Sequence, residues 1–385
     1  MDSGPAQTCL ICKTGTVAEI DGYRRLRRVT SEVKPFRTGG RIGVCPCCGA
    51  VQKIFDDTTR PDIDAIYANY DLYPLSDGVE QPIFDMSGRP LLRSTRIFRY
   101  LKDQVVLPET AALLDFGCGR GATLTEASRF FPKWRLFGSE LSNRSLDLLR
   151  KIPGFVKLFV GDVADISDRF DIVTMIHSLE HIFDPVEMLR ILATKLVPGG
   201  KIVIQVPDGG ANPYDMMIAD HVSHFTGDTL TLVAAMAGLA STATSTEVAA
   251  KELTWVLQPN PRIKVEVGSG GSRRLGEIEA DIRWLQEQAD MAGRISGAAT
   301  KFGIFGTATS GTWLAGELDG RFDFFVDEDT MRHGKIHVDR PVIGPADIPD
   351  GADVFLPLID KSARAVAARL GQAFPKVHFH VPPSR

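Results

Sequence analysis

A glycine-rich turn between a buried strand and a helix is the feature that most constrains this chain. Residues 111–116 (AALLDF) are typical of a buried strand, and residues 121–131 are typical of the helix that follows. Between them the chain reads Asp115-Phe-Gly117-Cys-Gly119-Arg-Gly121. Glycines here permit a tight turn and let a ligand approach the backbone, and the helix N-terminus offers free amides to an anionic group. The turn therefore suits the binding of a cofactor.

Further strands and helices alternate after this turn. Pro185 stands in a first helical turn, and Pro198-Gly199-Gly200 ends that helix. Such alternation favours a parallel sheet with helices on both faces, so we predict an α/β, Rossmann-like core. The expected strands are residues 134–138, 156–160, 170–175 and 201–206, and the expected helices are residues 91–107, 142–151 and 185–196.

The polar residues that follow successive strands separate two classes of cofactor. The turn alone also fits the dinucleotide-binding fingerprint through Gly117, Gly119 and Ala122, and a plain tight turn is a further alternative. Glu140 ends the second strand, where an acidic side chain accepts both ribose hydroxyls of either cofactor. Asp162 follows the third strand, where a carboxylate receives an adenine amino group.

This ordered series resembles the class I S-adenosylmethionine-dependent methyltransferases over residues 111–240. The sulfonium methyl of that cofactor is already activated, so such a protein mainly aligns the acceptor with the departing sulfur. A base matters only where the acceptor must lose a proton. The resemblance implies that S-adenosylmethionine is bound by Asp115, Gly117, Gly119, Gly121, Glu140, Leu141, Asp162, Val163 and His177.

Five of the six cysteines lie near the N-terminus, in a chain too long for a small disulfide-stapled domain. Two C-x2-C pairs occur there, and two such pairs close a tetrahedral thiolate site. We therefore predict one structural Zn²⁺ ion, with reduced core cysteines as the alternative. Cys47 either replaces Cys45 or stays free. The predicted ligands are Cys9, Cys12, Cys45 and Cys48.

Charge and hydropathy limit the partners of the protein. The run Arg24-Arg25-Leu-Arg27-Arg28 is more often a solvated face than a phosphate-binding site. A formal net charge of −4 argues against a general nucleic-acid binder. No apolar stretch is long enough to cross a bilayer, and the first residues lack the regions of a signal peptide. We expect a cytoplasmic protein without membrane partners.

With 385 residues, the chain is expected to divide into several domains. The loop Gly306–Gly311 in the last one can cradle a phosphate, although no lysine follows it and similar loops more often only turn the chain. Residues 268–274 are expected to be flexible, before a helix at about 275–291. The expected ranges are a zinc-binding module at 1–60, a helical lead-in at 61–110, the S-adenosylmethionine-binding core at 111–250, a linker and helix at 251–297, and a second α/β, Rossmann-like domain at 298–385.

Together, the cysteine pairs, the core and the trailing α/β domain resemble the sugar C-methyltransferase group. The resemblance implies a nucleotide-linked deoxysugar as acceptor, methylated next to a keto group. It also implies that His221 is the general base, that Asp220 orients it, and that His181 is a further active-site histidine. His224 is an alternative base, and structural histidines are the other reading. The family's glutamate is Asp220 here and its tyrosine is Ile218, so C- and O-methylation both stay open.

Two other function classes compete with this interpretation. The cysteine pairs and the arginine run also suit an RNA methyltransferase, although the acidic net charge weighs against it. A non-catalytic protein that kept the cofactor fold is the other class, and the presence of Asp115, Glu140 and Asp162 in order argues against it. The oligomeric state does not follow from the sequence.

Overall fold

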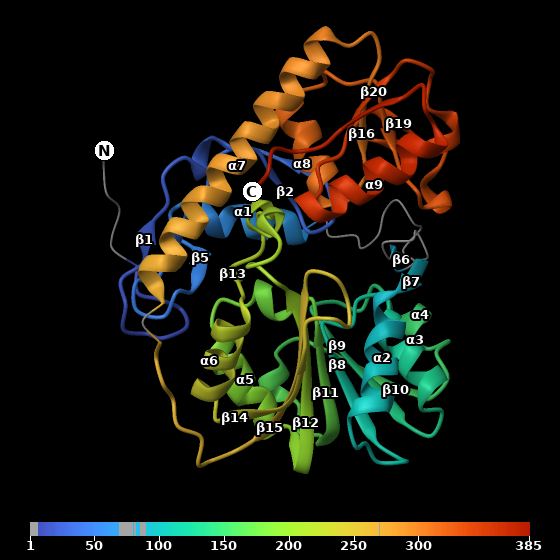
Figure 1. The fold of residues 1–385 in the computed structure, drawn as a ribbon. Helices are drawn as coiled ribbons and strands as arrows, with labels where there is room; N and C mark the ends of the chain where they lie inside the picture. The colour runs from blue at the N-terminus through green and yellow to red at the C-terminus, as the bar shows by residue number, and fades with distance from the viewer. Residues whose placement is uncertain (1–6, 69–79, 81, 85–89, 269) are drawn as a thin grey trace.

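The computed structural model describes residues 7–68, 80, 82–84, 90–268 and 270–385. The core sheet occupies the lower half of the molecule in Figure 1, and the cysteine-bearing N-terminal part and the C-terminal α/β part lie above it. Part of the lead-in expected at 61–110 lies outside the described residues. Its described elements are α1 (Thr59–Ala68), the paired strands β6 (Pro82–Phe84) and β7 (Pro90–Leu92), and α2 (Arg93–Gln104).

A seven-stranded sheet in the order β10-β9-β8-β11-β12-β15-β14 forms the core. The first five strands of that order run parallel, whereas β15 pairs antiparallel with β12 and β14 antiparallel with β15. The predicted, mostly parallel α/β core is confirmed. The strands are β8 (Ala112–Phe116), β9 (Arg135–Glu140), β10 (Phe155–Val160), β11 (Phe170–Ile176), β12 (Leu196–Pro207), β14 (Leu239–Ser245) and β15 (Glu252–Pro259).

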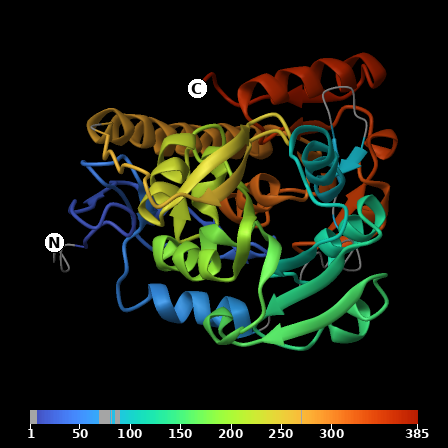
Figure 2. The same ribbon diagram turned by 90° about the horizontal axis from the view of Figure 1, so that it is seen from below.

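Helices cover both faces of this sheet, because successive side chains of a strand point to opposite faces. Leu113 is buried in the hydrophobic cluster that includes α2 and α3, and Leu114 in the cluster that includes α5 and α6. Figure 2 shows the two helix pairs on opposite sides of the strands. The helices are α3 (Ala122–Phe130), α4 (Leu146–Leu149), α5 (Pro185–Thr194) and α6 (Gly227–Met236).

Three boundaries differ from the sequence expectations. Strand β15 lies outside the core range 111–250, yet it completes the core sheet beside β12. Helix α7 (Gly271–Ala298) begins inside the stretch expected to be flexible. Its first residue packs closely against the N-terminal module, since a Cβ on Gly271 would stand 2.1 Å from the Pro46 carbonyl oxygen. The helix expected at 142–151 is shorter, because α4 spans only Leu146–Leu149.

The N-terminal module builds its main sheet with a strand from the core range. That sheet has the order β1-β4-β5-β13, in which β13 (Ser223–His224) pairs antiparallel with β5. Val29 also forms an isolated bridge with Ile218. The module is therefore joined to the core by backbone pairing. Its own strands are β1 (Ala18–Glu19), β2 (Arg28–Val29), β3 (Pro35–Phe36), β4 (Ile42–Val44) and β5 (Val51–Lys53).

The C-terminal part is a second doubly wound sheet, in the order β18-β19-β17-β16-β20-β21, and all neighbours except β18 and β19 run parallel. Its helix α8 packs against β2, β3 and the short helix η5 (Pro213–Met217). The elements are β16 (Phe302–Phe305), α8 (Thr309–Leu318), β17 (Phe324–Val326), β18 (Ile336–His337), β19 (Arg340–Ile343), β20 (Asp353–Phe355), α9 (Asp360–Ala373) and β21 (His378–His380).

Polar groups of the loop Gly306–Gly311 bond within the C-terminal part itself. The backbone amide and hydroxyl of Thr307 both donate to Asp327 Oδ2, at 2.9 and 2.6 Å. These contacts support the interpretation of the loop as a turn. Across the described ranges, no helix is both long and apolar enough to cross a membrane.

Gly311→Ala tests how tightly this loop closes. The added Cβ would stand 1.9 Å from the Gly306 carbonyl oxygen. We expect a loss of stability of about 1–3 kcal/mol from overpacking, measured as a lower Tm in thermal unfolding. Gly297→Ala is the matched control, because a Cβ there meets nothing within 4 Å in helix α7. An unchanged Tm for Gly311→Ala would contradict the packing described here.

Candidate active site

The glycine turn after β8 adopts the backbone conformation that its sequence predicts. Gly117, Gly119 and Gly121 have φ angles of +69°, +51° and +86°, a region that L side chains rarely enter. A Cβ on Gly121 would also lie 2.6 Å from Ile152 Cδ1. Glycine is thus required both for the turn and for the packing of α3 onto the next strand–helix unit.

Asp115 lies beneath this turn. Its side chain is 2% exposed, and its Oδ1 accepts a hydrogen bond of 2.7 Å from the hydroxyl of Thr174 on β11. Burial raises the pKa of Asp115 to about 7. The structure therefore places Asp115 as a buried polar support for the turn, on the side away from solvent.

Two carboxylates stand at the carboxyl ends of the neighbouring strands β9 and β10. Glu140 accepts hydrogen bonds from the amides of Gly119 (2.8 Å) and Leu141 (2.9 Å), so its carboxylate is fixed against the glycine turn. Asp162 is exposed and caps the short helix η3 (Val163–Asp165), whose first residue Val163 is buried. In open α/β sheets, ligands collect at this end of the strands.

This donor set fits S-adenosylmethionine. The Glu140 carboxylate suits a ribose diol, and the exposed Asp162 carboxylate suits an amino group. Leu141 lies next to Glu140 and is 75% exposed. An aromatic base that covered Leu141 would remove this surface from water.

His177 directly follows β11 and has a strained conformation, with a φ of +52°. Its Nε2 lies 2.5 Å from Glu252 Oε2, and its Nδ1 lies 3.3 Å from Glu180 Oε1. Burial and Arg93 lower the pKa of His177, but the two carboxylates outweigh them and raise it to about 9. His177, which was predicted to contact the cofactor, is thus an imidazolium that forms ion pairs with Glu180 and Glu252. Glu252 lies on β15, beyond the predicted core, and no sequence signal indicated it.

The structure pairs the predicted base, His221, with a carboxylate other than Asp220. His221 Nδ1 bonds to Asp215 Oδ1 at 2.7 Å, and His224 Nδ1 bonds to Asp215 Oδ2 at 2.6 Å. Asp220 instead accepts hydrogen bonds from the amide (2.9 Å) and hydroxyl (2.5 Å) of Ser31 in the N-terminal module. The turn at 219–220 directs Asp220 toward the module, so the carboxylate that orients His221 comes from the preceding helix η5.

His181 and His221 lie against each other edge to face, with ring centroids 4.7 Å apart. His181 Nδ1 lies 3.0 Å from the Asp220 carbonyl oxygen. Burial and the charge of His221 lower the pKa of His181, and burial lowers that of His224 to about 4. Burial also acts to lower the pKa of His221, but Asp215 and its acidic neighbours shift it upward overall. The site thus contains imidazoles with different proton affinities.

The histidine cluster adjoins the cofactor turn. A Cβ on Gly117 would stand 3.3 Å from Ser178 Cβ, and Ser178 precedes the helix η4 (Leu179–His181). The backbone carbonyl oxygen of Glu180, in η4, accepts a 2.7 Å hydrogen bond from the amide of Val222. The glycine turn, η4 and the segment that carries His221 are therefore in contact with one another. Asp215 and Glu180 were not predicted as site residues, although Glu180 directly precedes the predicted His181 and Asp215 lies five residues before Asp220.

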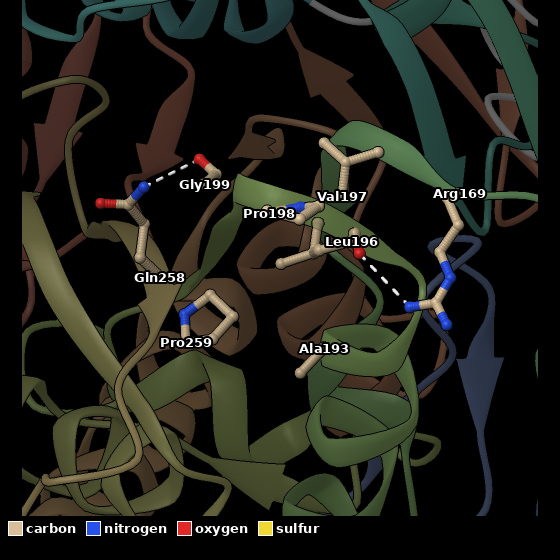
Figure 3. A pocket seen from close by; sticks show the side chains of 8 residues that line it. All are labelled: Arg169, Ala193, Leu196, Val197, Pro198, Gly199, Gln258 and Pro259. Carbon is tan, nitrogen blue, oxygen red and sulfur yellow. Dashed lines mark hydrogen bonds between the residues drawn. The ribbon is translucent and has the colours of Figure 1, made fainter.

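A separate hollow of about 630 Å³ lies elsewhere, at the opposite end of the core strands (Figure 3). Gln258 donates a 2.9 Å bond to the Gly199 carbonyl oxygen at its rim. None of the predicted site residues lines this hollow, so it takes no part in the candidate site. Its lining residues are Arg169, Ala193, Leu196, Val197, Pro198, Gly199, Gln258 and Pro259.

The four paired cysteines converge in space. Cys9 Sγ lies 3.7 Å from Cys48 Sγ, and Cys12 Sγ lies 3.6 Å from Cys45 Sγ. All four sulfur atoms lie within 4.8 Å of one another. A tetrahedral zinc site with Zn–S bonds of about 2.3 Å needs sulfur–sulfur separations of about 3.8 Å, so the arrangement fits a Zn²⁺ ion. Cys47 is exposed and lies outside the cluster.

Residues 92–244 match a family described as "Methyltransferase domain". They form a methyltransferase domain. A ubiquinone biosynthesis O-methyltransferase from Aeromonas salmonicida is 41% identical over 114 residues, which cover 28% of this chain and 47% of that protein. A dTDP-4-amino-2,3,4,6-tetradeoxy-D-glucose N,N-dimethyltransferase from Saccharopolyspora spinosa is 32% identical over 106 residues, which cover 26% of this chain and 41% of that protein.

Among solved structures, the mitomycin 7-O-methyltransferase is similar, with a TM-score of 0.38 and 17% identity over 43% of this chain and 53% of that chain. The chain spans less than half the length of the curated relatives it matches. The expected S-adenosylmethionine-dependent methyltransferase domain is confirmed. The zinc ion and the sugar acceptor stay predictions.

Glu140→Ala tests the cofactor pocket of the methyltransferase domain. The substitution removes the carboxylate that is expected to accept the ribose hydroxyls, so S-adenosylmethionine should bind about 1–3 kcal/mol more weakly by calorimetry. Glu247→Ala, on the exposed loop between β14 and β15, is the control and should bind normally. Equal affinity of the two variants would argue against the assignment of Glu140.

Proposed function

We propose that this chain catalyses methyl transfer from S-adenosylmethionine to a small-molecule acceptor, and that the acceptor is a nucleotide-linked sugar. The observation that carries the proposal is the buried Asp215–His221 hydrogen bond beside the glycine turn of a methyltransferase domain. This arrangement supports a proton acceptor close to the proposed cofactor site, as an acceptor that must lose a proton requires.

In the proposed reaction, S-adenosylmethionine supplies an activated methyl group. Asp215 accepts the Nδ1 proton of His221 and so fixes the tautomer in which Nε2 carries a lone pair. His221 Nε2 then takes the proton from the carbon or oxygen atom of the acceptor that becomes methylated. His181 packs against the His221 ring, and Asp220 and Ser31 hold the turn that carries both.

Several observations support a sugar acceptor. The dTDP-amino-sugar N,N-dimethyltransferase is a relative in the core region. The N-terminal module reaches the candidate site through Ser31 and β5, and α8 of the C-terminal part packs on η5, which carries Asp215. Residues of all three parts of the chain therefore adjoin the segment that carries Asp215 and His221. Incubation with nucleotide sugars or with RNA, followed by mass spectrometry of the acceptor, tests this directly.

The alternative of RNA methylation rests on the arginine run. Arginines of that run form ion pairs within the protein. Arg28 pairs with the buried carboxylate of Asp62, and Arg24 pairs with Glu19. Side chains held in this way are less available to phosphate groups. Methylation of RNA but of no nucleotide sugar would overturn the proposed acceptor class.

His221→Ala is expected to reduce turnover about a hundredfold or more, because the proton acceptor is lost. S-Adenosylmethionine affinity should stay nearly unchanged, since His221 lies outside the predicted cofactor contacts. Asp215→Asn should also reduce kcat, because the His221 tautomer is no longer fixed. His378→Ala, on the exposed edge strand β21, is the control. Near-full turnover of His221→Ala on the true acceptor would refute the assignment of the base.

We further propose that Cys9, Cys12, Cys45 and Cys48 hold one structural Zn²⁺ ion. Metal analysis should return about one zinc per chain, as a four-thiolate site requires. Cys12→Ser should lower both the zinc content and the Tm, because the metal closes the module. Cys47→Ser is the matched control from the same segment and should change neither. A fully folded preparation without metal would contradict this proposal.

A further inference from the structure

Glu180 is a buried carboxylate whose side-chain oxygens accept no hydrogen bond from the described residues. Its side chain is 1% exposed. The closest charged group is His177 Nδ1, 3.3 Å from Oε1, in an ion pair that lacks hydrogen-bond geometry. Leaving a carboxylate buried without hydrogen bonds is costly, so a cation bound directly to its oxygens would be favoured there.

Two imidazoles stand beside this carboxylate, and each is oriented through its Nδ1 atom. His221 Nδ1 bonds to Asp215, and His181 Nδ1 lies 3.0 Å from the Asp220 carbonyl oxygen. Metal-binding histidines are typically oriented in this way, by a carboxylate or a backbone carbonyl on the ring nitrogen that does not bind the metal. Nε2 of each ring is left as the available donor.

The three side chains are close enough to share one ion. One ligand atom from each of Glu180, His181 and His221 lies within 4.8 Å of the other two. Two imidazoles and one carboxylate suit Zn²⁺, Fe²⁺ or Co²⁺, whereas Mg²⁺ and Ca²⁺ prefer sites built from oxygen. The donors also differ from the four thiolates of the cysteine cluster, so the two sites are chemically distinct.

We propose that Glu180, His181 and His221 form a second metal site, for a divalent transition-metal ion, and that occupation of this site blocks methyl transfer. The first half stands on the geometry alone. The second half rests on the proposed function, because a bound ion takes the lone pair with which His221 would accept the proton of the acceptor. In this proposal, His221 acts as the base when the ion is absent, and methyl transfer is blocked when the ion is bound.

Cobalt titration tests the binding half without any turnover. Protein whose cysteine cluster is filled with zinc is titrated with Co²⁺ in the absence of S-adenosylmethionine, and visible absorption is followed. We expect one additional equivalent to bind, without the near-ultraviolet thiolate bands that displacement of zinc would produce. Absence of saturable binding, or binding only with thiolate bands, would overturn the proposal and leave the proposed function untouched.

Matched variants assign the ligands. Glu180→Gln keeps the size of the side chain and should weaken Co²⁺ binding about tenfold or more, and Asp215→Asn should weaken it about 10–100-fold through the orientation of His221. His378→Ala, a surface histidine, should bind Co²⁺ normally. Circular dichroism confirms folding, and His181→Gln replaces Glu180→Gln if that variant unfolds. Unchanged affinity in the folded variants would overturn the assignment.

The inhibitory half is tested by the methyl-transfer assay with increasing Co²⁺. Turnover should fall with a midpoint that matches the Kd from absorption, and a chelator should restore it. Saturable binding with undiminished turnover would keep the metal site but overturn both the inhibition and the role of His221 as base. The metal site, tested by absorption, therefore stands or fails independently of the proposed function.

Discussion

Backbone pairing between the N-terminal module and the segment before α6 holds the candidate site together. Strand β13, which ends at His224, pairs with β5, and the Ala219 amide donates a 2.7 Å bond to the Val29 carbonyl oxygen. The amide of Lys53 adds a 2.9 Å bond to the Val222 carbonyl oxygen. The histidines are therefore positioned by main-chain hydrogen bonds to residues that come nearly two hundred positions earlier.

The electrostatics of the site depend on a few buried carboxylates, each of which interacts with two basic side chains. Asp215 bonds to two histidine rings at once, and Glu252 bonds to His177 and pairs with Arg93. Because each carboxylate is buried, its hydrogen bonds cannot be replaced by water without cost. Removal of one partner is therefore expected to disturb a whole network, and single substitutions should be interpreted with that coupling in view.

Local sequence patterns predicted the core well, because the strand, the glycine turn and the next helix lie within some twenty residues. Gly117 and Gly121 follow from backbone geometry, and Glu140 follows from its place at a strand end. The errors have a different origin. The family resemblance implied that Asp220 orients His221, but a turn and a contact with Ser31 direct Asp220 elsewhere, and Asp215 bonds to His221 instead. Strand β15 and the start of α7 likewise depend on distant pairing partners, which no local pattern contains.

The pairing of β5 with β13 also constrains the order in which the chain can fold during synthesis. Strand β5 ends at Lys53, whereas β13 begins at Ser223, so about 170 residues must be made before the edge of β5 is covered. At about 5–20 residues per second, this takes roughly 10–30 s on the ribosome. For that time the module presents an open strand edge, which is a site for pairing with other chains. Early binding of a metal by the nascent cysteine cluster would hold the module compact until its last strand arrives.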